Sequence, residues 1–202
     1  MTDQHASDPS GGLYESPESG TWIIDPVHSF VTFSVLHMAV SFARGMAAGP
    51  FGVITVGRDL LDSRVEAHID ASTLTTLNPL RDSKVLGPDL LDVSNFATID
   101  FVSTRLWTSG ENFYELSGDL TIHGVTKNVS LDLILNGVVL DTWGNRRLGI
   151  TATTELSRDD FGVGEWGHVP LRAGGFMVPS RVKVTLDIEA TKEAESAEEL
   201  AG

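Results

Sequence analysis

The sequence of 202 residues contains no cysteine. This absence excludes disulfides, thiolate nucleophiles, iron–sulfur clusters and cysteine-based zinc sites. No run of about 18 consecutive apolar residues is present, so the sequence predicts no membrane-spanning helix. Basic residues are scarce, because 14 Lys and Arg stand against 28 Asp and Glu and give a formal net charge of −14. Such a charge does not favour nucleic acid or anionic lipid surfaces as general partners.

The two ends differ in composition from the body. Residues 1–19 carry four acids and no Lys or Arg, and residues 191–202 are rich in Ala and Glu. Segments of this kind bury too little apolar surface to fold, so we predict a disordered acidic leader, one domain over 20–190 and a flexible acidic tail. Residues 1–12 contain no base and no apolar stretch typical of a secretory signal, which predicts a cytoplasmic location.

Alternation of apolar and polar side chains recurs along the body. In 64–71 and 181–189, apolar residues occupy every second position and polar residues lie between them. This period of two is typical of strands with one dry and one wet face. The other predicted strands are 29–37, 53–56, 98–107, 113–122, 125–135 and 147–156. Eight one-sided strands without helices between them predict an all-β fold, with an antiparallel sheet that closes into a barrel or folds over itself.

One short helix is predicted after residue 78. Asn78 is a good N-cap, Pro79 suits the first helical position, and Gly87 followed by Pro88 ends the helix.

The interior of such a barrel has two interpretations. An eight-stranded barrel is just wide enough to be filled by its own side chains or to hold one small ligand. The residues expected to face inward are mostly Val, Leu, Ile and Phe, so a bound ligand would be apolar. Periodicity alone leaves the filled and the hollow barrel both open.

Two motifs resemble functional sites by composition. Asp25, His28 and Ser29 share the residue types of a catalytic triad, but such close neighbours in an extended segment are not expected to converge. The stretch 162–167 matches G-x-G-x-x-G, yet loop residues follow it where dinucleotide binding requires a helix, which favours a glycine-rich connection. The six histidines do not cluster at metal-ligand spacing, so a metal site would have to assemble in space.

Two further positions carry alternatives. His37 is either a satisfied polar residue at a barrel end or a hydrogen-bond partner for the head group of a ligand. Arg158 precedes Asp159 and Asp160, and a salt bridge beside a turn is favoured over acid–base chemistry, because adjacent residues on a strand point apart.

Several segments, in the same order, resemble the YceI-like domain family. The opening Trp-Ile-Ile-Asp-Pro-Val-His-Ser at 22–29 resembles the start of that domain. The stretch 118–127 is similar to its G-x-L-T-x-x-G-V-T-K hairpin, and 158–163 is similar to its R-x-D-F-G turn. Further similarities lie at 44–52, 90–103 and 182–189. The resemblance covers about residues 20–190.

The resemblance implies an elongated, lipocalin-like barrel with a short helical flap. It also implies that the barrel holds a polyisoprenoid or a related lipid-like amphiphile, and that the protein forms homodimers. The chain departs from the family pattern after Arg81 and Asp82, where Lys84-Val85 replaces the usual His-Leu pair, and the preferred head group is therefore open.

We interpret the chain as a protein that carries or stores an isoprenoid-like lipid, without catalysis and without a cofactor other than this ligand. The residues expected to form the apolar lining are Phe33, Val35, Val65, Ile69, Ile99, Phe101, Leu116, Leu120, Ile122, Val129, Leu131, Leu133, Ile150, Val184 and Leu186. The polar groups expected at the mouth are His37, Arg81, Asp82, Lys84 and Arg158. The alternatives are a filled barrel that serves as a structural or interaction module, and an enzyme acting on a lipid with His37 as its titratable group.

Overall fold

The computed structural model describes residues 15–164, 168–172 and 174–193. Within these residues ten antiparallel strands form one sheet. The strands are β1 Gly20–Ile24, β2 Phe30–His37, β3 Ser41–Ala48, β4 Phe51–Val56, β5 Arg64–Asp70, β6 Thr98–Gly110, β7 Phe113–Ile122, β8 Val125–Leu140, β9 Arg146–Ser157 and β10 Arg181–Lys192. Short 3-10 turns lie at Leu60–Asp62, Ala71–Thr73 and Arg158–Phe161.

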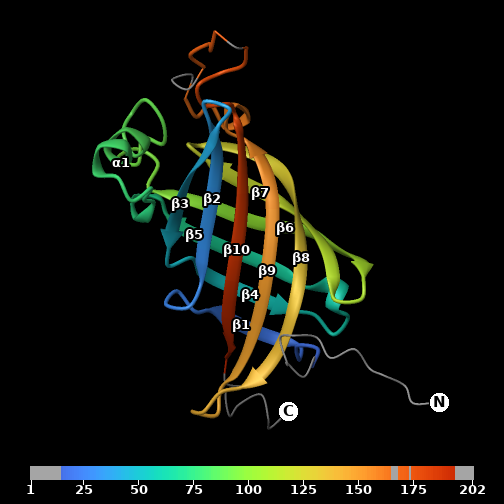
Figure 1. Cartoon of the computed structure of the whole chain (residues 1–202). Coiled ribbons are helices and arrows are strands. Elements are labelled where there is room, and N and C mark those ends of the chain that lie inside the picture. Colours follow the sequence, from blue (N-terminus) through green and yellow to red (C-terminus); the bar gives the residue numbers. More distant parts are fainter. Residues whose placement is uncertain (1–14, 165–167, 173, 194–202) are drawn as a thin grey trace, which may run out of the picture.

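Eight of these strands close into a barrel, which runs in the order β1, β4, β5, β6, β7, β8, β9 and β10 and returns to β1 (Figure 1). The closure depends on β10, because its two halves have different partners. Its first half, from Val182 to Asp187, pairs with β2, whereas Ala190 to Lys192 pair with β1. The β2–β3 hairpin therefore extends from the sheet at the upper end of β10 in Figure 1.

The closed antiparallel barrel with one short helix confirms the predicted fold class, but the strands differ from those expected. The sequence predicted neither β1 nor β3. Strand β1 has only five residues, and β3 contains Gly and several Ala in place of the β-branched residues that mark strands. Strand β2, predicted to belong to the barrel, lies in the hairpin, and β8 continues beyond the predicted residue 135 through a β-bulge between Leu135 and Gly137.

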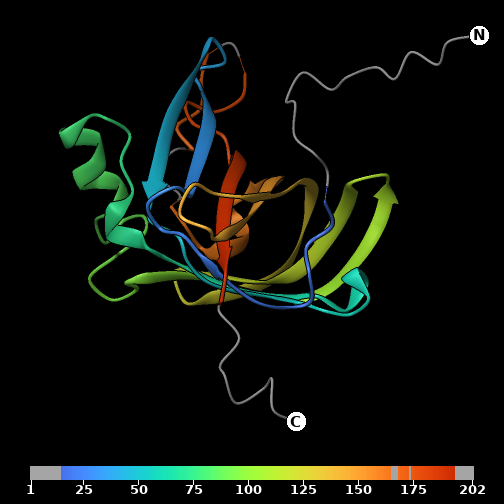
Figure 2. The ribbon, with the colours of Figure 1, turned by 90° about the horizontal axis from the view of Figure 1, so that it is seen from below.

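The predicted helix is present as α1, Pro79–Val85, in the segment that joins β5 to β6. The Asn78 side chain accepts a hydrogen bond from the backbone N–H of Arg81 at 3.1 Å, which caps the helix as expected. This segment is fixed to β3, because Met46 and Thr75 exchange two backbone hydrogen bonds of 2.8 Å. Figures 1 and 2 accordingly show α1 beside β3, at the side of the barrel.

A compact core closes the lower end of the barrel in Figure 1, where β1 crosses it. Trp22 and Ala190 are 0% exposed and Leu148 is 1% exposed. Ile24 and Ile54 pack into the same cluster. An indole buried to this extent removes about 200 Å² from water, which contributes about 5 kcal/mol of gross hydrophobic stabilisation. The lower end is therefore a packed floor.

The described parts of the two ends contact this floor. The Trp22 indole N–H donates to the carbonyl of Glu18 at 3.0 Å, and Lys192 Nζ donates to the carbonyl of Ser19 at 2.6 Å. Arg146 forms an ion pair with Glu15 at 2.9 Å. Strand β10 ends at Lys192, two residues into the predicted tail. Residues 1–14 and 194–202 lie outside the described residues, so disorder there stays a prediction.

No helix in the described part of the chain has the length and apolar composition needed to cross a membrane.

Candidate ligand cavity

The barrel encloses a cavity of about 650 Å³. Its walls follow from the alternation in the sequence, because cross-strand partners direct their side chains to the same face of the sheet. Val184 of β10 pairs with Phe33 on one side and with Thr154 on the other, and all three line the cavity. The structure therefore decides between the two interpretations of the interior: this barrel is hollow.

All of the apolar side chains predicted for the lining are found there, together with His37, Arg81 and Arg158. Further lining residues were not predicted. Some lie on the predicted strands, among them Val31, Ala152 and Leu156, and two groups lie outside those strands. The first comes from β3 and includes Ser41, Phe42, Ala43, Arg44 and Ala47. The second comes from residues 71–97 between β5 and β6, here called the flap, and from the loops at the upper end. It includes Leu74, Val85, Leu90, Leu91, Phe161 and Met177. No period of two marks these segments, so alternation does not reveal them.

Asp82 and Lys84, which were predicted at the mouth, are not among the residues that line the cavity. Arg81 and Val85 lie one helical turn apart and face the interior. Asp82 points back along the flap, where its carboxylate accepts hydrogen bonds from the Thr76 N–H and the Thr75 hydroxyl, each at 2.7 Å. Lys84 is exposed. Asp82 therefore orders the turn before α1 and does not form part of the mouth.

Thr76 connects Asp82 to Arg81. Its hydroxyl donates to the Asp82 carboxylate, and this hydrogen bond is the main cause of a lowered pKa of Asp82. The Thr76 side-chain oxygen accepts from Arg81 Nε at 2.7 Å, and its backbone carbonyl accepts from Arg81 Nη2 at 2.8 Å. Two hydrogen bonds thus fix the Arg81 guanidinium at the cavity wall.

Arg158 also lines the cavity, but it does not form the predicted salt bridge. In the part of the chain that the structure describes, Asp159 pairs with His168 at 3.3 Å, and no ion pair joins Arg158 to Asp159 or Asp160. The guanidinium instead donates to the carbonyl of Gly164 at 2.7 Å and to that of Val178 at 3.1 Å. Burial lowers the pKa of the Arg158 guanidinium. The chain turns away after Phe161, because Gly162 adopts a left-handed conformation with φ of +67°.

Two glycines give space to aromatic rings inside the cavity. A Cβ at Gly45 would lie 2.2 Å from Phe33 Cζ, and a Cβ at Gly118 would lie 2.3 Å from Phe101 Cζ. Real Cβ atoms do not approach other atoms so closely. The ends of the Phe33 and Phe101 rings therefore occupy the space above these two glycines, on the neighbouring strands.

A second polar group lies near the floor, on the outer side of the barrel wall. The Asp25 carboxylate and His28 Nδ1 are 2.9 Å apart, so the expectation that these neighbours do not converge is wrong for this pair. A turn between β1 and β2 brings them together. Ser29 does not complete a triad, because its hydroxyl bonds to the backbone of Glu189 at 2.9 and 3.1 Å.

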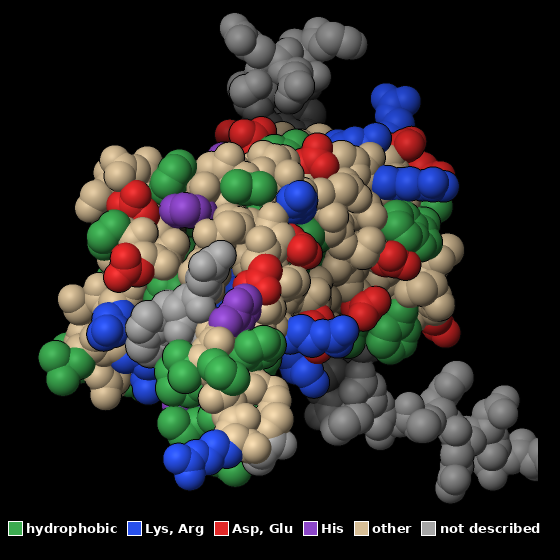
Figure 3. All heavy atoms as spheres, turned by 90° about the horizontal axis from the view of Figure 1, so that it is seen from above, with side chains coloured by type: hydrophobic (Ala, Val, Ile, Leu, Met, Phe, Trp, Pro, Cys, Tyr) green, Lys and Arg blue, Asp and Glu red, His purple; other side chains and the backbone are tan. Residues whose placement is uncertain are grey.

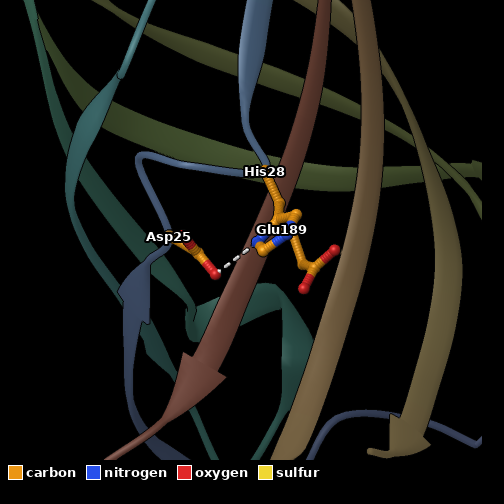
Figure 4. A group of neighbouring side chains, drawn as sticks. All are labelled: Asp25, His28 and Glu189. Carbon is orange, nitrogen blue, oxygen red and sulfur yellow. Dashed lines mark hydrogen bonds and ion pairs between the residues drawn. The ribbon is translucent and has the colours of Figure 1, made fainter.

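The side chains of Asp25, His28 and Glu189 come from this turn and from β10 (Figure 4). Their ligand atoms lie within 4.8 Å of one another, which is close enough to surround a metal ion. Arg147 Nη1, however, donates to both carboxylates, with 2.9 Å to Asp25. Burial opposes ionisation of Asp25, but the hydrogen bonds from His28 and Arg147 outweigh it and lower the pKa of Asp25 to about 2. The Arg147 guanidinium thus already supplies the positive charge that a metal ion would bring. Asp25, His28, Glu189 and Arg147 form an ion-pair network that joins the turn to β9 and β10.

Comparisons with known proteins agree with this architecture. The profile of the YceI-like domain matches residues 22–190. A UPF0312 protein of Pseudomonas putida strain W619 is 34% identical over 137 residues, which cover 67% of this chain and 71% of that protein.

Solved structures show the same fold at low sequence identity. BcnA of Burkholderia cenocepacia is similar with a TM-score of 0.69 and 20% identity, over 83% of this chain and 99% of that chain. A polyisoprenoid-binding domain from Saccharophagus degradans, implicated in plant cell wall breakdown, is similar with a TM-score of 0.67 and 14% identity, over 87% and 100%. Because the family profile reaches from within β1 to residue 190 of β10, and so includes all the strands of the barrel, this chain belongs to the YceI-like domain family.

Proposed function

We propose that the protein binds a long-chain isoprenoid or a similar lipid-like amphiphile in the barrel and carries or stores it. The observation that carries this proposal is the 650 Å³ cavity with walls formed almost entirely by aliphatic and phenylalanine side chains. Its volume lies within the range of about 300–1,000 Å³ that is typical of small-molecule sites. Membership of the family, and the polyisoprenoid-binding domain among the structural neighbours, support the same ligand class.

Burial of the tail supplies the affinity. Each buried CH₂ group contributes about 0.8 kcal/mol, so about ten of them contribute about 8 kcal/mol before the cost of association. A saturated or prenyl tail makes no hydrogen bonds, and the lining of β5 to β9 offers it none except at Thr154. Binding and transport therefore require no reaction, and the role that we propose is not enzymatic.

Native mass spectrometry of the purified protein, followed by organic extraction, tests this proposal. We expect a stoichiometric adduct that fragments into prenyl or alkyl units, and the same spectrum reports whether the protein is the expected homodimer. The matched variants are Ala152→Phe, which fills the cavity, and Thr153→Phe, which adds the same ring to the exposed face of β9. The first should lose the adduct and the second should keep it.

An apo mass that persists after incubation with farnesol, ubiquinone and oleic acid would contradict the proposal. Equal retention of the adduct by both variants would show that the lipid binds outside the barrel, which also contradicts it.

A further inference from the structure

The ionisable side chains that line the cavity are three arginines and one histidine. Among the described lining residues are His37, Arg44, Arg81 and Arg158, but no Asp and no Glu. The whole chain has twice as many acids as Lys and Arg, so the lining departs from the composition of the protein. On the outer surface of the upper end, acidic, basic and hydrophobic side chains are interspersed (Figure 3). The absence of carboxylates is therefore specific to the interior.

Arg158 is the group in this set that has a buried nitrogen without a hydrogen-bond acceptor among the described residues. Its Nη atoms donate to the backbone carbonyls of Val163, Gly164 and Val178, which hold the guanidinium in one orientation. Its Nε is buried, and no polar atom of the described chain accepts its hydrogen. The guanidinium is half-buried, and the neighbouring Asp159 carboxylate acts on its charge without forming an ion pair with it, so an anion on the cavity side would stabilise this charge further. A guanidinium that lines a cavity is suited to the oxygens of a carboxylate or a phosphate.

The position of Arg158 sets the orientation of the amphiphile. It begins the turn after β9, at the upper end of the barrel, beside Leu90 of the flap, and both side chains reach within 3.0 Å of the position a Cβ would take on Gly164. The opposite end of the barrel is the packed floor around Trp22, which is 0% exposed. An amphiphile therefore enters with its tail toward the floor and leaves its head at the upper end.

We infer that the ligand carries an anionic head group, a carboxylate or a phosphate, which binds the Arg158 guanidinium at the upper end of the cavity. This inference rests on the proposed function, because it requires an amphiphile in the barrel. Arg81, which Thr76 holds at the cavity wall, supplies a second positive charge to the same cavity. Alcohols and quinones with the same tail lack the charge that these groups recognise.

The test uses ligands with one tail and different heads: farnesol, farnesoic acid and farnesyl monophosphate. Isothermal titration calorimetry with the full chain measures each Kd. We expect one or both anions to bind at least about tenfold more tightly than farnesol, a difference of about 1.4 kcal/mol. A preference for the acid or for the phosphate identifies the head group, and either supports the inference.

The variant Arg158→Gln should reduce the affinity for the anions to that for farnesol and leave the affinity for farnesol unchanged. Arg181→Gln is the matched control, because Arg181 is 80% exposed at the same end and does not line the cavity. It should retain the preference for anions. If Arg158→Gln does not fold, the wild-type protein with the three ligands still tests the preference for anions. Arg158→Lys keeps the positive charge but loses Nε–H, and its affinities for the same three ligands are then compared with those of the wild type.

Two outcomes overturn the inference and differ in what else they show. If farnesol binds as tightly as both anions, the head-group inference is wrong and the proposed lipid binding stands. If none of the three binds, and no lipid is extracted from the purified protein, the proposed function fails as well.

Discussion

The contact between Gly118 and Phe101 predicts a measurable coupling between two positions inside the cavity. An alanine at Gly118 places its Cβ 2.3 Å from Phe101 Cζ and 2.5 Å from Cε2. Relief of this overlap moves the ring, and overpacking of this kind costs about 1–3 kcal/mol of the free energy of unfolding. Phe101→Leu shortens the side chain and removes both overlapping ring atoms. A further contact of 2.7 Å to the Val102 carbonyl remains in either background.

Gly118→Ala is therefore expected to cost less in the presence of Phe101→Leu than alone. Urea unfolding of the wild type, both single variants and the double variant gives the coupling energy, which we expect to be about 0.5–3 kcal/mol in the favourable direction. Gly110→Ala is the control, because its nearest contacts lie at 3.6 Å or more, and it should be near neutral. Additivity of the two substitutions within about 0.3 kcal/mol would show that the ring does not lie over Gly118, and would refute this description of the cavity wall.

Three further predictions concern the cavity, the ion-pair network and the flap. Leu116 is one of five residues that line both the main cavity and a second one of about 40 Å³, so Leu116→Ala should cost about 2–5 kcal/mol in urea unfolding and shift binding toward longer tails; unchanged tail-length selectivity would contradict this. The lowered pKa of Asp25 stabilises the fold above about pH 4, and this contribution is lost as the pH falls through about 2. Asp25→Asn should therefore make the free energy of unfolding depend less on pH over that interval. An unchanged slope of the free energy of unfolding against pH would exclude this role. Asn78→Ala removes the cap of α1 and should cost about 0.5–2 kcal/mol locally, seen as faster hydrogen exchange in 79–85 with β6 and β7 unaffected.

The helix and the face of each predicted strand could be read from the sequence because both depend on neighbours within the same segment. Asn78 caps its own helix, and Val65 and Ile69 lie on one side of β5 whatever pairs with that strand. Strand β3 could not be predicted in this way, because its pairing with β2 holds residues that have little preference for strands. The direction of Asp82 could not be predicted for a similar reason, since its hydrogen-bond partners Thr75 and Thr76 determine it.

The sequence by itself determined an all-β barrel, its apolar inner face and its family, because alternation and local motifs are properties of short segments. The tertiary structure decided that the barrel is hollow, since open space depends on how Phe33 and Phe101 lie over Gly45 and Gly118 across strands. It also decided the electrostatics. The convergence of Asp25 and Glu189 on Arg147, and the position of Arg158 in a lining without Asp or Glu, arise only when distant segments meet in the closed sheet.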